Sequence, residues 1–103
     1  MPPNEEIKRD VEELGGDGWE LKDDKLVKSF QFSSFVNSVS AIEFVNSVTN
    51  IAEKVNHHPI IKINWRTVKL SLKSFDVNAI TKRDINLAKA ITDHWKATRS
   101  EIY

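Results

Sequence analysis

The stretch Glu53–Pro59, with the sequence EKVNHHP, decides how the chain is divided. It stands where a long helical pattern of apolar residues stops and an alternating, strand-like pattern begins. Asn56 tolerates the left-handed conformation that closes helices, and Pro59 pushes His58 towards an extended backbone. The same stretch holds two of the chain's three histidines. We therefore expect a polar corner between a helix and a strand.

The pattern upstream of this corner predicts a helix of about twenty residues, or about 30 Å. Ser33 or Ser34 is expected to be its N-cap, because a serine oxygen accepts a hydrogen bond from a free N–H group of the first turn. One apolar stripe repeats every three or four positions, at Phe35, Val39, Ile42, Val45, Val48, Ala52 and Val55. Phe44 and Ile51 widen this apolar side, and they face either the core or a subunit partner.

Downstream of the corner, residues 60–65 and 68–75 predict a hairpin. In its second strand the apolar and polar residues alternate. Val68, Leu70 and Leu72 share one face, and Lys69, Ser71 and Lys73 share the other. Phe75 has the parity of the lysines. It is the one large apolar residue on that polar face.

Both ends of the chain predict helices. Residues 4–14 carry an amphipathic pattern, with Asn4 as the expected N-cap. Near the other end Thr81 is expected to cap a helix that runs to about Thr98, with Asp84 three residues later in a variant of the capping box. The inner stripe of this last helix is expected to be Ile85, Ala88, Ile91 and Trp95.

Between the first two helices the sequence predicts another hairpin. Glycines gather at residues 15–18, and two short strands at 19–21 and 25–32 flank an Asp23-Asp24 turn. The predicted order is α-β-β-α-β-β-α in a single domain, residues 1–103. Because hairpins pair antiparallel, we expect an α+β fold: a four-stranded antiparallel sheet with helices on one face.

The composition narrows the function classes. Lys+Arg and Asp+Glu are both 15, so the chain lacks the basic imbalance usual in nucleic-acid-binding proteins, and we expect no direct nucleic-acid partner, although a local basic patch is compatible with these totals. No apolar run approaches the ~20 residues that span a bilayer, and the N-terminus does not resemble a signal peptide, so we expect no membrane partner. Cysteine is absent, which excludes disulfides. These features predict a cytoplasmic protein.

The histidines of the corner suggest acid–base chemistry. Imidazole titrates near neutral pH, so two adjacent histidines can supply a proton donor and a proton acceptor. Glu53 precedes His57 by one helical turn and is expected to orient that ring. Two other interpretations stay open at this point: a polar loop without chemistry, and a metal site. The metal site lacks a convincing further ligand, because His94 is about 15 Å from Asp84 along the last helix.

A family resemblance adds to this interpretation. Glu53–Pro59, followed by an aromatic residue at Trp65 and by Asp84 within residues 81–88 (TKRDINLA), resembles the pterin-4a-carbinolamine dehydratases. The family combines an acid, three further residues, His-His-Pro, a later aromatic residue and a later acid. Residues 30–35 and the strand at Trp19 are also similar. The resemblance covers most of the chain and implies the same α-β-β-α-β-β-α order.

The resemblance implies a reaction, the dehydration of 4a-hydroxytetrahydrobiopterin or a related carbinolamine, with no metal and no organic cofactor. It implies that His57 and His58 are catalytic and that a pterin is the small-molecule substrate. The substrate-binding positions it implies are Glu53, Pro59, Trp65, Ser74, Phe75 and Asp84. Asp84 would hold a histidine or a polar group of the substrate. Family members commonly form homodimers or homotetramers.

The chain also departs from the family pattern. The family usually has a third histidine, in a Thr-His pair, where this chain has Ser74-Phe75. The family's tryptophan two places after His-His-Pro is replaced by Ile61. Because phenylalanine cannot transfer a proton, the sequence predicts a 4a-hydroxytetrahydrobiopterin dehydratase of reduced activity. The alternatives are a non-catalytic pterin-binding protein and a protein-interaction module, since some family members are dimerisation cofactors of a hepatocyte nuclear factor.

Overall fold

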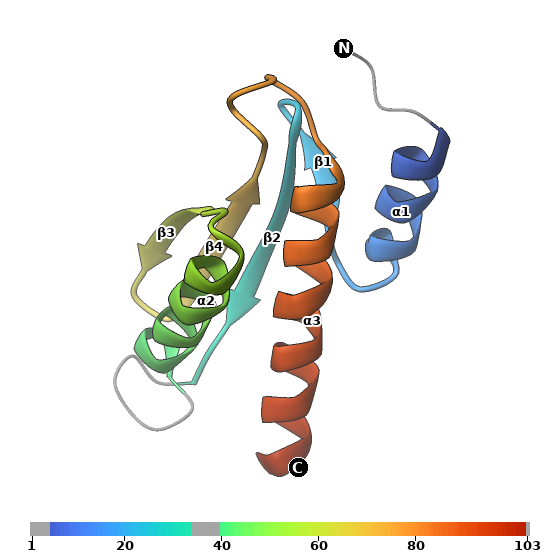
Figure 1. Ribbon diagram of the computed structural model, residues 1–103. Helices are drawn as coiled ribbons and strands as arrows, with labels where there is room; N and C mark the ends of the chain where they lie inside the picture. Colours follow the sequence, from blue (N-terminus) through green and yellow to red (C-terminus); the bar gives the residue numbers. More distant parts are fainter. Residues whose placement is uncertain (1–4, 34–39, 103) are drawn as a thin grey trace.

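The computed structural model describes residues 5–33 and 40–102. Along the chain it contains α1 (Glu5–Gly15), β1 (Glu20–Lys22), β2 (Lys25–Gln31), α2 (Ala41–Val55), β3 (Ile60–Asn64), β4 (Thr67–Leu72) and α3 (Lys82–Ile102). The predicted order and the α+β class are confirmed (Figure 1). None of the described helices is long and apolar enough to cross a membrane.

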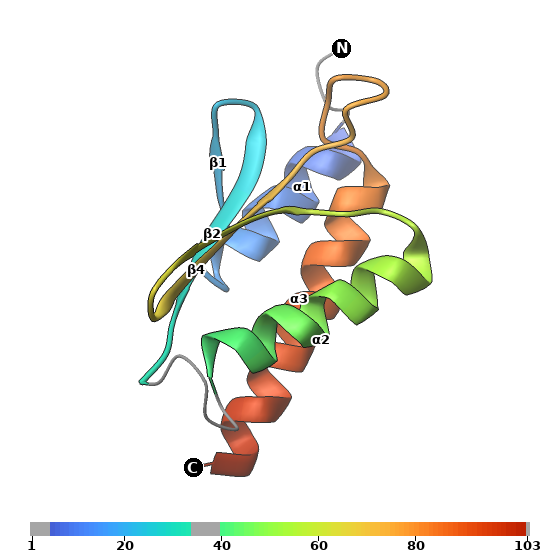
Figure 2. The same cartoon turned by 90° about the vertical axis from the view of Figure 1, so that its left-hand side faces the viewer.

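The strands form one four-stranded sheet in the order β1-β2-β4-β3, and every neighbouring pair is antiparallel. All three helices lie on the same side of this sheet (Figure 2). The β1–β2 hairpin turns through Asp23 and Asp24, which have φ of 52° and 62°. Two consecutive left-handed residues match the right-handed twist of the strands, which is why the predicted Asp-Asp turn forms.

Alternation along β2 and β4 builds the core. Leu26 pairs with Leu72 and Phe30 with Val68, and all four side chains are buried. The ring of Phe30 lies 4.6 Å from that of Phe44 on α2 and 5.0 Å from that of Trp95 on α3, measured between centroids. One strand residue therefore ties the sheet to both helices, and aromatic pairs at such distances stabilise beyond their buried area.

The predicted beginning of the second helix is wrong. α2 begins at Ala41, and its N-cap is Ser40, whose hydroxyl accepts a hydrogen bond of 3.1 Å from the N–H of Glu43. Ser33 precedes this cap by seven positions and is not part of α2. The predicted cap Ser34 lies outside the described residues, as do Phe35 and Val39 of the predicted stripe. So does Asn4, the predicted cap of α1.

The buried face of α2 also differs from the predicted stripe. Its buried residues are Ala41, Phe44, Val48 and Ala52, whereas Val55 is 56% exposed. The helix packs against both the sheet and α3, because the ring of Phe44 contacts the rings of Phe30 and Trp95. Phe44 therefore belongs to the core of this chain. Its side chain is buried and does not form a surface for a subunit partner.

The start of α3 is tied to α1 by charge. The Lys82 ammonium lies 2.7 Å from Asp10 Oδ2 and 3.0 Å from Glu6 Oε1. Hydrogen bonds to these two carboxylates raise the pKa of Lys82 above its ordinary value, and the bond to Asp10 has the larger effect. Further along α3, Lys89 lies 3.6 Å from Asp10 and Lys96 lies 2.8 Å from Asp17. The first turn of α3, which carries Asp84, is thus held from the side of α1.

Candidate functional site

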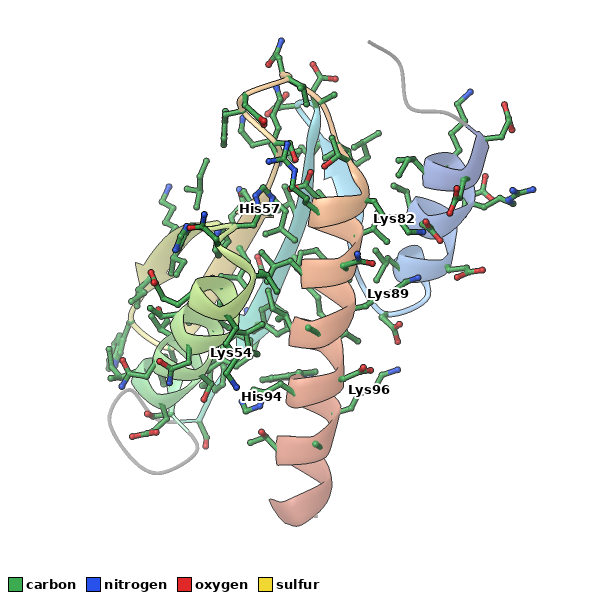
Figure 3. All side chains as sticks on the ribbon, viewed as in Figure 1. Lys54, His57, Lys82, Lys89, His94 and Lys96 are labelled. Carbon is green, nitrogen blue, oxygen red and sulfur yellow. The ribbon has the colours of Figure 1, made fainter. Side chains whose placement is uncertain are left out.

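The corner forms because α2 ends at Val55 and Asn56 caps it, as the sequence predicts. Asn56 is left-handed, with φ 51° and ψ 42°, and the N–H of His57 donates to the carbonyl of Ala52 at 3.1 Å. The reversed backbone directs the chain from α2 towards the first turn of α3. Figure 3 shows His57 in the space between these two helix ends.

His57 is paired with a buried carboxylate. Its Nε2 lies 2.6 Å from Asp84 Oδ1, and the two side chains are 11% and 0% exposed. The other oxygen, Asp84 Oδ2, accepts from the hydroxyl of Ser74 at 2.8 Å and from the N–H of Thr81 at 2.9 Å. An ionised carboxylate only accepts hydrogen bonds, so Nε2 of His57 donates and Nδ1 is left for another partner.

Ser74 extends this network. Its side chain is fully buried, and its Oγ lies 2.7 Å from Thr81 Oγ1. Because Ser74 donates to Asp84, Thr81 is the donor between the two hydroxyls. Thr81 also accepts from the N–H of Arg83 at 3.3 Å. The predicted capping box is therefore present, with Asp84 bonded back to the N–H of Thr81, and the same carboxylate that caps α3 also holds His57.

His58 is paired with Glu53. Its Nε2 lies 2.8 Å from Glu53 Oε1, and the two side chains are 50% and 69% exposed. The predicted pairing of Glu53 with His57 is wrong. The left-handed Asn56 carries His57 on towards α3, and His58 then folds back over the last turn of α2. Each histidine consequently has its own carboxylate.

Phe75 lies in a short loop beside this network. Ser74 and Ala79 form an antiparallel bridge that closes the loop, and Phe75 within it is 58% exposed. Phe75 was expected on a strand, but β4 ends at Leu72. Asp76 binds Arg83 at 2.6 Å, and this hydrogen bond lowers the pKa of the Asp76 carboxyl below its ordinary value. The loop is thereby tied to the first turn of α3.

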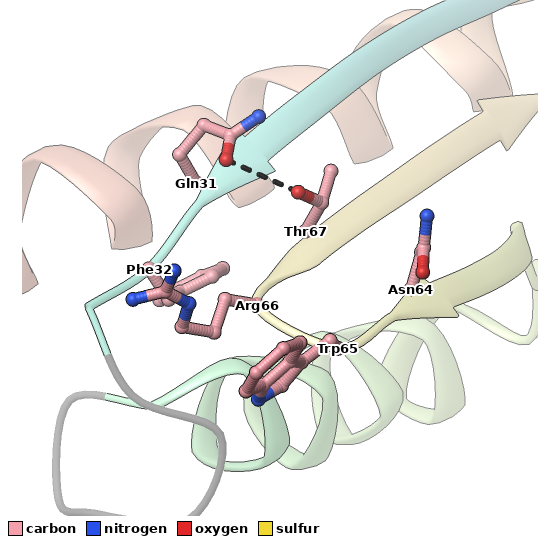
Figure 4. Close-up of a pocket in the computed structure, with 6 residues that line it drawn as sticks. All are labelled: Gln31, Phe32, Asn64, Trp65, Arg66 and Thr67. Carbon is pink, nitrogen blue, oxygen red and sulfur yellow. Dashed lines mark hydrogen bonds between the residues drawn. The ribbon is translucent and has the colours of Figure 1, made fainter.

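Trp65 is not brought to the histidines. It lies in the β3–β4 turn, at the opposite end of β3 from Pro59, and the six residue steps between the two span about 20 Å. There it is 71% exposed and lines a separate pocket of about 400 Å³ with Gln31, Phe32, Asn64, Arg66 and Thr67 (Figure 4).

Comparisons with known proteins identify the family of this chain. The sequence model described as pterin 4 alpha carbinolamine dehydratase matches residues 2–94. A protein of Roseiflexus sp. that bears this family's name is 42% identical over 86 residues, which is 82% of this chain and 89% of its own. A protein of the same name from Thermosynechococcus vestitus is 40% identical over 76 residues, 74% of this chain and 77% of its own. The chain belongs to the pterin-4a-carbinolamine dehydratase family.

A solved structure supports this assignment. The chain is similar to a protein of Brucella melitensis described as a transcriptional coactivator/pterin dehydratase, with a TM-score of 0.77 and 26% identity. The alignment covers 90% of this chain and 97% of that one. The pterin dehydratase family therefore accounts for the fold as well as for the sequence motif.

Among the described residues, no group of three or more His, Cys, Asp or Glu side chains is arranged to hold a metal ion. His94 lies apart from the corner, stacked against Phe44 at 6.3 Å between ring centroids and 3.4 Å from the Thr98 hydroxyl. The family's replaced tryptophan position, Ile61, packs partly buried against the core.

Sequence reasoning missed the roles of Ser74 and Thr81 in the site. The sequence held one sign of the role of Ser74. This residue shares the parity of Leu70 and Leu72, so its side chain was bound to point towards the core. A buried hydroxyl needs a hydrogen-bond partner. The sequence alone could not show that this partner is Asp84.

Proposed function

We propose that this protein dehydrates a 4a-hydroxytetrahydropterin, such as 4a-hydroxytetrahydrobiopterin, to the quinonoid dihydropterin, at a reduced rate. The observation that carries the proposal is that each histidine of the corner has its own carboxylate, His57 with Asp84 and His58 with Glu53. The reaction needs one group to protonate the departing hydroxyl, which leaves as water, and another to accept the proton from the ring nitrogen. Two separately held imidazoles meet that need without a metal.

The carboxylates determine which atoms react. Since both histidines use Nε2 for the carboxylate, Nδ1 is the atom of each ring that exchanges a proton with the substrate. His57 is fixed in a buried network, whereas His58 is half exposed. The substrate ring is accordingly placed against the Nδ1 side of His57, with His58 at the open side.

Ser74 has a different role from the predicted one. Because its side chain is fully buried and donates to Asp84, we assign it a positioning role through Asp84 and not a contact with the substrate. Asp84 likewise acts through His57. Pro59 contributes by fixing the backbone that follows His58.

Phe75 is the reason for expecting a reduced rate. An exposed phenylalanine offers a flat apolar face for a pterin ring, and the Lys73 ammonium lies 5.9 Å from its centroid. It cannot give or take a proton. Losing one general acid or base typically lowers a rate by ~10²–10⁴-fold, so we expect turnover above the uncatalysed rate and well below that of a relative with histidine at this position.

The test is the dehydration rate of a synthetic 4a-hydroxytetrahydropterin with wild type, His57→Ala and His58→Ala. Wild type is expected to exceed the uncatalysed rate, and each substitution to remove most of the excess. Three rates equal to the uncatalysed one would end the dehydratase proposal. Phe75→His is expected to raise the rate, because it restores a proton carrier next to Ser74. An unchanged rate would mean that a side chain at this position does not reach the substrate.

A second function is favoured by Phe75 itself, since an exposed aromatic ring in place of a proton carrier suits binding without turnover. In this alternative the corner holds a pterin or a partner protein. Pterin binding measured by fluorescence quenching, together with an uncatalysed dehydration rate, would support the non-catalytic pterin-binding protein. A stable heteromeric complex with neither binding nor turnover would support the interaction module.

We also propose self-association, as is common in the family. Its support in this structure is the exposure of Val55 and Ile60, at 56% and 46%, on either side of the corner. Sedimentation velocity on the full chain tests it, and a monomer at all concentrations would reject it.

A further inference from the structure

The face of the sheet turned away from the helices, called here the outer face, is rich in lysine. No described helix lies on this side (Figure 2). Strand alternation places four lysines on it, here named the outer lysines: Lys22, Lys25, Lys62 and Lys69. Glu20 is the one acidic residue at an outward position of the four strands. The charges are thus unevenly distributed over the surface, although the chain has equal numbers of acidic and basic residues.

The outer lysines face one another. Lys22 pairs directly with Lys25, and Lys62 with Lys69. Like charges directly opposite in an antiparallel pair are destabilising. The lysines on the helix side differ, since Lys82, Lys89 and Lys96 each have an aspartate partner. Within the described part of the chain, none of the outer lysines has an ion pair. Their ammonium groups are therefore open to an anion from solution.

A second observation at one end of this face points to the kind of anion. Gln31, Thr67 and Asn64 occupy the last outward row of the sheet, next to the pocket that Trp65 and Arg66 complete (Figure 4). Trp65 is 71% exposed and has a φ of 54°, a conformation that costs energy for a bulky residue. The structure therefore holds a tryptophan outward, beside amide side chains and a guanidinium.

We propose that the outer face binds single-stranded nucleic acid, with the outer lysines contacting phosphates and Trp65 stacking on a base. Basic surfaces with an exposed aromatic platform are the usual means of holding single strands. The Thr67 hydroxyl donates to Gln31 Oε1 at 3.1 Å, which leaves the amide N–H groups of Gln31 for a base edge. From Lys25 to Gln31 the face is about 20 Å long, room for a few nucleotides.

Other anions fit this surface less well. A duplex hides the faces of its bases, so Trp65 would have no base on which to stack. An acidic peptide or an anionic lipid surface would use the outer lysines without the row of amides. The inference does not rest on the proposed dehydratase activity, because Trp65 and the outer lysines lie outside the histidine corner.

The experiment is a fluorescence-anisotropy titration of a labelled oligouridylate of about ten nucleotides with the full chain. Saturable binding is expected at about 50 mM salt, weakening strongly towards about 200 mM. The double variant Lys62→Ala/Lys69→Ala should bind more weakly and lower the slope of log K against log salt by about 1.4, at about 0.7 per phosphate contact. Trp65→Ala should weaken binding by about 5- to 150-fold, whereas Trp65→Phe should retain most of it.

The matched control is Lys8→Ala/Lys54→Ala, which removes the same charge from α1 and α2. It is expected to leave affinity and salt slope nearly unchanged. Absence of saturable binding, equal losses in the two double variants, or no effect of Trp65→Ala would each overturn the proposal. So would equal competition by a duplex of the same length, by polyglutamate or by anionic phospholipid vesicles.

Discussion

The two histidine–carboxylate pairs have the same chemistry in opposite surroundings. The contact distances are similar, 2.6 Å for His57–Asp84 and 2.8 Å for His58–Glu53. The first pair is 11% and 0% exposed, and Asp84 accepts two further hydrogen bonds. The second is 50% and 69% exposed, and no other side-chain hydrogen bond to Glu53 is found among the described residues.

Because of this difference in exposure, the contact distance does not measure how much each pair contributes to the stability of the fold. An exposed ion pair is screened by water and contributes about 0–1 kcal/mol. Removing one partner of a buried pair leaves polar groups without acceptors and costs about 3–5 kcal/mol. His57 is thus fixed by the fold, while His58 can change its rotamer at little cost. We infer that His57 sets the position of the substrate and that His58 adapts to it.

The largest effect is expected from truncating each carboxylate in turn. Asp84→Ala removes the acceptor of His57, Ser74 and the N–H of Thr81, and should lower the free energy of unfolding by about 3–5 kcal/mol. Glu53→Ala is the matched control and should lower it by less than about 1 kcal/mol. Urea unfolding at neutral pH measures both. Equal losses would contradict the contrast between the two pairs.

Much of the fold was predictable because its signals are local. Alternation in β4, the Asp23-Asp24 turn and the left-handed Asn56 each depend on a few neighbouring residues, and all three are present. The face of α2 was predicted less well, because Phe44 is buried by residues far away in the sequence, Phe30 and Trp95. A helical stripe alone does not tell which neighbours the helix will have.

The candidate site, like the fold, was predicted only in part. The motif singled out the two histidines, Glu53 and Asp84 as candidates. It did not show which of them pair, since Asp84 is 27 positions from His57. The predicted partner of Glu53 was wrong because a single left-handed residue between them redirects the chain. Trp65 was grouped with the site through the family pattern, and the length of β3 keeps it away.

A middle-sized effect is expected at Ser74, which belongs only to the buried pair. Ser74→Ala leaves Asp84 Oδ2 with one donor fewer and should cost about 1–3 kcal/mol. By loosening His57 it should lower kcat more than it raises KM, while Ser74→Thr, which keeps a hydroxyl, should restore the rate. The ¹⁵N spectrum of His57 checks the cause independently of turnover, because the Nε2–H tautomer should lose population in Ser74→Ala. An unchanged tautomer together with lost activity would show that Ser74 acts in another way.

The smallest effect is expected at a third pair, which separates distance from burial. Asp76 and Arg83 lie 2.6 Å apart, as close as His57 and Asp84, but their side chains are 62% and 49% exposed. If burial decides, Asp76→Asn should behave like Glu53→Ala and leave stability nearly unchanged. The hydrogen bond from Arg83 lowers the pKa of Asp76 below 3.8 in the folded chain. The stability that it contributes is therefore present above that ordinary value and is lost as pH falls through the lower, folded pKa. Urea midpoints of wild type and Asp76→Asn should differ slightly at neutral pH and converge in acid. A difference as large as that of Asp84→Ala would mean that contact distance, and not burial, sets the strength of all three pairs.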